Sequence, residues 1–166
     1  YWAARMGLLV WGELPSAYLI NDRAIRAGSE VAFDFLERDY NHPSIITWVP
    51  ANESWGISNV RSDRSQQEYC RMLTSQLHAL DPTRLVSAND GWEQVEQTDL
   101  CAIHDYSLAP ESCDAYEDWD AVTKTQMRPR LVFADGNSWR GQPVMITEFG
   151  GIAFESGKED DSWGYN

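Results

Sequence analysis

Two glutamates each follow an apolar, strand-like run of the sequence. Glu53 comes shortly after residues 45–49, and Glu148 comes shortly after residues 144–146. Hydrolysis of a glycosidic bond needs two carboxyl groups, one protonated and one ionised, that face each other across the sugar. Parallel strands end at a common edge of their sheet, so glutamates that are far apart in the sequence can meet there. The spacing therefore predicts a catalytic carboxylate pair.

Five short apolar runs recur along the chain, and each is followed by polar residues. They cover residues 8–11, 45–49, 85–86, 100–103 and 144–146. The runs are nearly continuous rather than alternating, which is typical of strands buried on both faces of a parallel sheet. We expect five such strands.

Helical patterns lie between these runs. One helix is expected to begin at Ser29 as its N-cap and to end before Pro43, and another to open with a capping box from Ser65 to Glu68. The remaining connections are expected to be a turn or two of helix at 91–99, a helix at 115–123 and a loop at 126–142. Strand and helix in alternation indicate βαβ units with right-handed crossovers.

The alternating pattern fits either a (β/α) barrel or a doubly wound sheet. No glycine-rich phosphate loop follows the first run, and sugar-compatible polar residues follow every run, which favours the rim of a barrel. Eight units need about 250 residues, whereas the chain has 166. Residues 1–166 are therefore expected to be an incomplete α/β barrel domain, an internal segment of a longer chain.

Composition narrows the choice of partners. The net charge is −13, from 26 acidic and 13 basic side chains, which disfavours nucleic acid and makes a neutral substrate easier to bind than an anionic one. No apolar stretch approaches the roughly 18 residues of a membrane span. The first residues read as the middle of a helix rather than as a leader, so the sequence assigns no compartment, and it assigns no oligomeric state.

The cysteines and histidines show no ligand spacing. The chain has three of each, and neither a disulfide framework nor a metal motif can be drawn among them. We expect no metal and no cofactor. Tryptophan is enriched, with eight in the chain; each could be a core residue or a flat platform for a sugar ring. Trp92 and Trp139 are the loop candidates for sugar stacking.

Several segments resemble glycoside hydrolase family 2, the family of β-galactosidases, β-glucuronidases and β-mannosidases. They are GLLVWGELP at 7–15, NHPSII at 41–46 leading to NES at 52–54, DPTR at 81–84 and ITEFGG at 146–151. The resemblance runs through nearly the whole chain in the family's order. It implies about strands 3 to 7 of the family's TIM (β/α)8 barrel, without the first two strands, the eighth strand and the β-sandwich domains that precede the barrel.

The resemblance also implies roles for individual residues. Glu53 would be the acid/base, Glu148 the nucleophile, and Asn52 would hydrogen-bond the sugar 2-hydroxyl. Tyr106 matches a tyrosine that hydrogen-bonds the nucleophile. Apolar surroundings such as Trp48 and Trp55 could keep Glu53 protonated.

Further polar residues lie at the expected rim, where they could touch sugar or be structural; they are Glu13, Asn89, Asp90 and His104. The function expected is that of a retaining β-glycosidase acting on a carbohydrate substrate, with β-galactoside as the default glycone. The isolated segment is expected to be inactive or to aggregate. The alternative is a non-catalytic carbohydrate-binding protein that kept the barrel.

Overall fold

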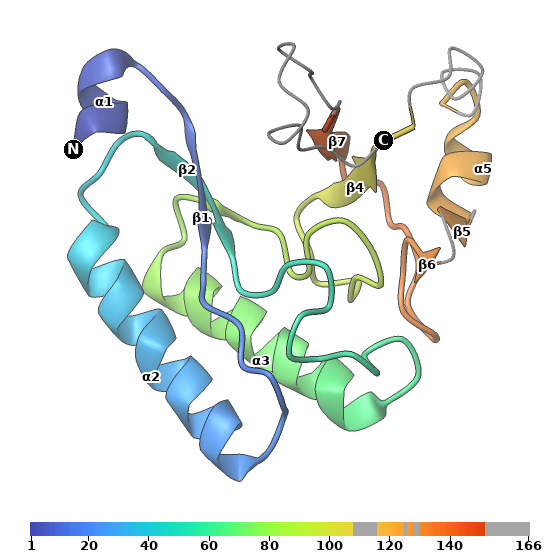
Figure 1. Cartoon of the computed structure of the whole chain (residues 1–166), viewed down its shortest axis with the longest axis horizontal. Helices are drawn as coiled ribbons and strands as arrows, with labels where there is room; N and C mark the ends of the chain where they lie inside the picture. Colours follow the sequence, from blue (N-terminus) through green and yellow to red (C-terminus); the bar gives the residue numbers. More distant parts are fainter. Residues whose placement is uncertain (108–115, 125, 128–129, 152–166) are drawn as a thin grey trace, which may run out of the picture.

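The structure is a computed structural model that describes residues 1–107, 116–124, 126–127 and 130–151. All five expected strands are present (Figure 1). The elements in chain order are α1 (Trp2–Met6), β1 (Val10–Glu13), α2 (Asp22–Asp39), β2 (Ile45–Val49), α3 (Arg64–Leu80), β3 (Leu85–Val86), β4 (Cys101–Asp105), α5 (Trp119–Lys124), β5 (Gln126–Met127), β6 (Arg130–Leu131) and β7 (Val144–Phe149).

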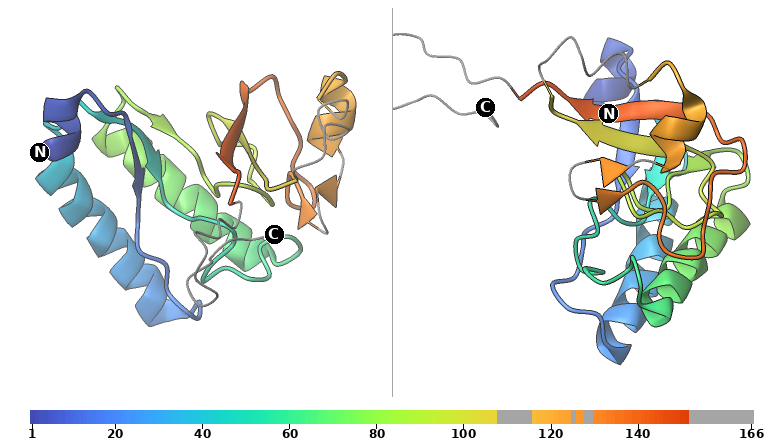
Figure 2. Two further views of the ribbon diagram at one scale, coloured as in Figure 1. Left: turned by 45° about the horizontal axis from the view of Figure 1, so that its top comes forward. Right: turned by 90° about the vertical axis from the view of Figure 1, so that its right-hand side faces the viewer.

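The five expected strands form two parallel groups. β1, β2 and β3 make a three-stranded sheet in that order, and β4 pairs with β7. Between the groups, the carbonyl of Val86 in β3 accepts a hydrogen bond from the backbone N–H of Asp99, 2.9 Å away, just before β4. The groups thus follow one another as in an open part of a barrel wall (Figures 1 and 2).

The helix starts differ from those expected. α2 begins a turn or more earlier, because Asn21 caps it by accepting the Ala24 backbone N–H at 2.9 Å. Ser29 lies inside the helix and donates to Gln76 of α3 at 2.8 Å. α3 is capped by the carboxylate of Asp63 rather than by a capping box. An anion at this position also complements the positive end of the helix dipole.

Two connections differ as well. Residues 91–99 contain turns and an isolated bridge but no helix. The segment expected to be a loop at 126–142 includes a short antiparallel pair, β5 with β6. The third expected helix exists as α5, a few residues later than expected.

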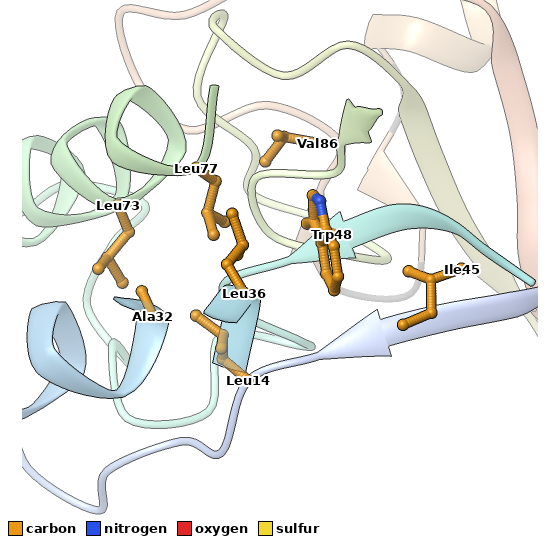
Figure 3. Packing of buried hydrophobic residues seen from close by; sticks show 8 residues of the cluster. All are labelled: Leu14, Ala32, Leu36, Ile45, Trp48, Leu73, Leu77 and Val86. Carbon is orange, nitrogen blue, oxygen red and sulfur yellow. The ribbon is translucent and has the colours of Figure 1, made fainter. Parts of the chain in front are cut away.

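The main core lies between the helix pair α2–α3 and the β1–β2–β3 sheet (Figure 3). Trp48 of β2 is fully buried there, and its indole N–H donates to Asp81 at 2.9 Å. Gly12 of β1 faces this ring, because a Cβ at Gly12 would lie 3.0 Å from it. Burial of apolar rings and aliphatic side chains drives this packing. It anchors β1, which ends at Glu13, and β2, which leads into the turn that carries Glu53.

The polar residues expected at the rim lie at or just after the carboxyl ends of the parallel strands. The outer edges of the open wall are apolar. Leu9, before β1, is 73% exposed, and Phe149, in β7, is 75% exposed. No helix within the described part of the chain combines the length and apolar character needed to cross a membrane.

Candidate active site

Glu53 and Glu148 converge at the carboxyl ends of the strands. His104 stands between them, with Nδ1 2.7 Å from Glu53 Oε1 and 3.5 Å from Glu148 Oε2. One donor atom from each of the three side chains lies within 4.8 Å of the other two. The two carboxylates that the sequence places on distant strands therefore face the same small space.

A strained turn presents Glu53. Its φ is +51° and that of Ser54 is +59°, a left-handed conformation that costs a residue with a side chain about 1–2 kcal/mol. Two hydrogen bonds hold the turn: Glu53 N–H donates to the carbonyl of Asp90 at 2.9 Å, and Ser54 N–H donates to Asn89 Oδ1 at 3.0 Å. The turn is thus fastened to the end of β3.

Asn89 is buried and supports the loops rather than facing solvent. Its amide donates to Ser54 Oγ at 3.0 Å and to the carbonyl of Trp92 at 2.7 Å. Ser54 in turn donates to Glu93. Trp92 is half-buried and packs edge-on against His104, with ring centroids 5.5 Å apart. These contacts bring both residues to the site as neighbours of Glu53 and His104.

Asp90 joins the strands at this end of the sheet. Its carboxylate is 1% exposed and accepts hydrogen bonds from Trp11 Nε1 at 2.7 Å, Thr147 Oγ1 at 2.9 Å and Ser87 Oγ at 3.3 Å. The donors come from β1, β7 and the end of β3. Position after a strand was the only sequence signal for Asp90, because Trp11 and Thr147 are distant from it in the chain.

Tyr106 and Asn52 complete the surroundings of the two glutamates. The Tyr106 hydroxyl donates to Glu148 Oε2 in a short hydrogen bond. Asn52 Oδ1 is buried and has no hydrogen-bond partner among the described residues. A cavity of about 370 Å³ lies beside Asn52 and Glu13, with Trp55 on its wall. A buried acceptor without a partner is costly, and a bound hydroxyl would satisfy it.

The sequence predicted that tryptophans would give Glu53 an apolar environment, and this prediction is wrong. Trp48 packs in the core between sheet and helices, and Trp55 is 63% exposed. The partner that Glu53 does have is His104, a titratable group. Burial disfavours the charged imidazole of His104, but the surrounding carboxylates outweigh burial and raise its pKa to about 9. Burial and nearby carboxylates also raise the pKa of Glu13.

Trp139 lies apart from this group. It packs against Cys101, Val132 and Phe133, and its indole N–H donates to the carbonyl of Gln142 at 2.8 Å. Cys101 opens β4, whereas His104 is near the end of that strand. The contacts of Trp139 are therefore with the opposite end of the β4–β7 pair, and the structure does not bring it to the glutamates.

Glu53, His104 and Glu148 also offer three donor atoms close enough to meet one metal ion. Direct hydrogen bonding between Glu53 and His104 already accounts for this proximity. We assign no metal to the group.

A comparison with protein families identifies the chain. The family described as "Glycosyl hydrolases family 2, TIM barrel domain" matches residues 11–161. The chain belongs to glycosyl hydrolase family 2. This match and the parallel strands confirm the α/β partial barrel expected from the sequence.

Individual relatives agree with this family. A β-glucuronidase of Paenibacillus borealis is 23% identical over 172 residues, covering 95% of this chain and 28% of that protein. A β-galactosidase of Enterobacter cloacae is 29% identical over 144 residues, covering 83% of this chain and 12% of that protein. The crystal structure of a family 2 β-galacturonidase from Eisenbergiella tayi shares the fold, with a TM-score of 0.69 and 19% identity over 98% of this chain and 29% of that one. The chain thus spans about a quarter of the length of the first of these relatives.

Proposed function

We propose that this chain is the central part of the catalytic barrel of a retaining β-glycosidase, with Glu148 as nucleophile and Glu53 as acid/base. The observation that carries the proposal is the approach of the two carboxylates, whose oxygens come within 4.8 Å across His104. Retaining enzymes hold their carboxyl groups about 5–5.5 Å apart, whereas inverting enzymes need about 6.5–9.5 Å to admit a water between them.

The residues have complementary roles in this reaction. Glu148 attacks the anomeric carbon while Glu53 gives its proton to the departing glycosidic oxygen, which forms a glycosyl-enzyme and frees the aglycone. Glu53 then takes a proton from water, and the water oxygen displaces Glu148. Tyr106 donates a hydrogen bond to the nucleophile and holds its carboxylate in place. Asn52, whose buried Oδ1 has no partner among the described residues, would accept a hydrogen bond from the sugar 2-hydroxyl.

The charge of the site favours a neutral sugar. Four carboxylates (Glu13, Glu53, Asp90 and Glu148) surround the single imidazole of His104, so a uronate carboxylate held among them would meet repulsion. The guanidinium of Arg130 lies over the ring of Trp92, but it is paired with Glu93 at 3.0 Å. We therefore propose a neutral β-hexoside, with β-galactoside as the first substrate to test. Relatives named β-glucuronidase make β-glucuronide the necessary comparison.

The test uses the full-length protein that contains this chain. We expect hydrolysis of p-nitrophenyl β-galactoside with retention at the anomeric carbon, read by NMR of the first product formed. A 2-deoxy-2-fluoro glycoside should label the peptide that carries Glu148. Glu148→Gln should lose at least about 10³-fold in kcat, because an amide cannot form the glycosyl-enzyme.

The matched control is Glu68→Gln, a surface glutamate of α3 that pairs with arginines. It should keep normal kcat. Faster hydrolysis of the glucuronide than of the galactoside would contradict the neutral glycone. Activity that survives Glu148→Gln, or an inverted product, would refute the assigned mechanism. Sugar binding without turnover on a broad substrate panel would favour the carbohydrate-binding alternative.

A further inference from the structure

His104 is enclosed by acidic groups instead of facing solvent. Its side chain has no exposed surface, and its Nδ1 meets Glu53 and Glu148. Its other nitrogen, Nε2, lies 3.9 Å from Asp90 Oδ2 and has no hydrogen-bond partner among the residues that the structure describes. The ring therefore connects the buried Asp90 to Glu53 through its two opposite nitrogens.

Asp90 cannot turn away from the ring easily. Trp11 Nε1 holds Oδ2, the oxygen that faces His104, and Thr147 Oγ1 holds Oδ1. The negative charge of Asp90 therefore favours a proton on His104 Nε2. With that site occupied, Nδ1 is the nitrogen that can exchange a proton with Glu53.

We propose that Asp90 and His104 are positioning residues for Glu53, and that the His104–Glu53 pair holds in common the single proton that glycosidic cleavage requires. This inference rests on the acid/base role proposed above for Glu53. In one form the pair is an imidazolium and a carboxylate. In the other, the Nδ1 proton has moved to Glu53 Oε1, which leaves a neutral imidazole protonated at Nε2 and a carboxylic acid. The net charge of the pair is the same in both forms.

The arrangement supplies what the missing apolar setting would have supplied. The ionisable groups around the ring are Glu13 from β1, Glu53 after β2, Asp90 after β3, Glu148 in β7, and the phenol of Tyr106, whose ring centroid is 6.5 Å from that of His104. Burial opposes an imidazolium, but these carboxylates raise the pKa of His104 to about 9. The pair therefore keeps its proton through neutral pH and loses it only in alkaline solution.

Asp90→Asn removes the charge while it can keep the geometry. The amide oxygen can still accept from Trp11, and the amide nitrogen can donate to the hydroxyl of Thr147. With the charge gone, the pair should release its proton at lower pH. We expect the alkaline limb of kcat/KM to move down by about one pH unit or more in the full-length enzyme, measured with an alkyl β-glycoside whose leaving group needs the acid.

A second measurement tests the role of Asp90 with a leaving group that needs no acid. A 2,4-dinitrophenyl β-glycoside departs without protonation, so its kcat/KM should change less than about threefold in Asp90→Asn at neutral pH. His104→Gln should shift the limb in the same direction. In the His104→Gln background, Asp90→Asn should add no further shift, because its effect is transmitted by the imidazole.

Asp81→Asn is the matched control. Asp81 is also a buried aspartate that accepts from an indole, that of Trp48 at 2.9 Å, but it lies at the end of α3. Its substitution should lower thermal stability without moving the alkaline limb. If Asp90 had only a structural role, Asp90→Asn would likewise lower thermal stability and leave the alkaline limb unmoved.

Distinct outcomes separate the two proposals. An unmoved alkaline limb in a folded Asp90→Asn enzyme, or equal losses on the alkyl and dinitrophenyl glycosides, would overturn the role of Asp90. If Asp90→Asn does not fold, an unmoved limb in His104→Gln overturns the shared proton. Absence of hydrolysis by the unaltered enzyme on every glycoside would instead refute the proposed function.

Discussion

Gly91 is the position where one added methyl group should disturb the site most. Its φ is +98°, and an alanine Cβ there would lie 2.7 Å from His104 Nδ1 and 2.8–2.9 Å from two carbons of the ring. Carbon contacts prefer about 3.5 Å or more. The ring must therefore move by roughly 0.6 Å or more, although Trp92 packs edge-on against it.

The expected cost of Gly91→Ala has two parts. The left-handed backbone costs an alanine about 1–2 kcal/mol, and the displaced ring costs about 1–3 kcal/mol of packing energy. Movement of His104 by that distance lengthens its 2.7 Å contact with Glu53 to as much as roughly 3.3 Å when the ring moves directly away from the carboxylate, beyond a good hydrogen bond. Loss of a hydrogen bond to a charged group is worth about 1.5–3 kcal/mol, or roughly 10- to 150-fold in kcat/KM.

Gly141→Ala is the matched control, because Gly141 has a φ of +94° and nothing lies within 4 Å of the place that an alanine methyl would take there. Both variants carry the backbone cost, so their difference isolates the contact with His104. The assay is kcat/KM and thermal unfolding of the full-length protein. If Gly91→Ala matches Gly141→Ala in both activity and stability, the reasoning about His104 and Glu53 is wrong.

Three further predictions concern stability and chemistry. Burial alone would raise the pKa of Asp81, but hydrogen bonds, among them one from Arg84, lower it to about 2. Asp81→Asn should therefore lower the free energy of unfolding by about 2 kcal/mol at pH 7, measured by urea unfolding. The difference between the two proteins should shrink as pH falls from about 4 to about 2. Burial raises the pKa of the Cys70 and Cys101 thiols to about 12, so peptide mapping should find both unlabelled by iodoacetamide at pH 8 until the protein unfolds. Expressed alone, residues 1–166 should aggregate on size exclusion, because the outer strands have open edges and apolar side chains such as Phe149 are exposed; a monomeric, active segment would contradict this.

Local patterns located the strands well and the helix starts poorly. Each strand is an apolar run bounded by polar residues, and burial on both faces of a parallel sheet demands such a run. The start of a helix is harder to predict when several residues before it could serve as the N-cap. Asn21 and Ser29 are both good N-cap types, and the contact of Ser29 with Gln76 on a neighbouring helix places it inside α2.

The tryptophans show why side-chain type alone does not assign a role. Trp48 lies near the end of β2 and packs under the helices, whereas Trp92 lies in the loop after β3 and packs on His104. Trp139, in a loop like Trp92, contacts the opposite end of its sheet. Burial depends on which segments fold against each residue, and the run of neighbours along the chain carries little of that information.

Order along the chain was enough to put Glu53 and Glu148 at one rim, since parallel strands all end on the same side. The roles proposed for Asp90 and His104 required the folded molecule. Asp90 is held by Trp11 and Thr147, which come from opposite parts of the sequence, and His104 meets both glutamates only because the two sheets bring their ends together. Strand position is encoded locally by apolar runs, whereas protonation and orientation arise from charges and hydrogen bonds between distant segments.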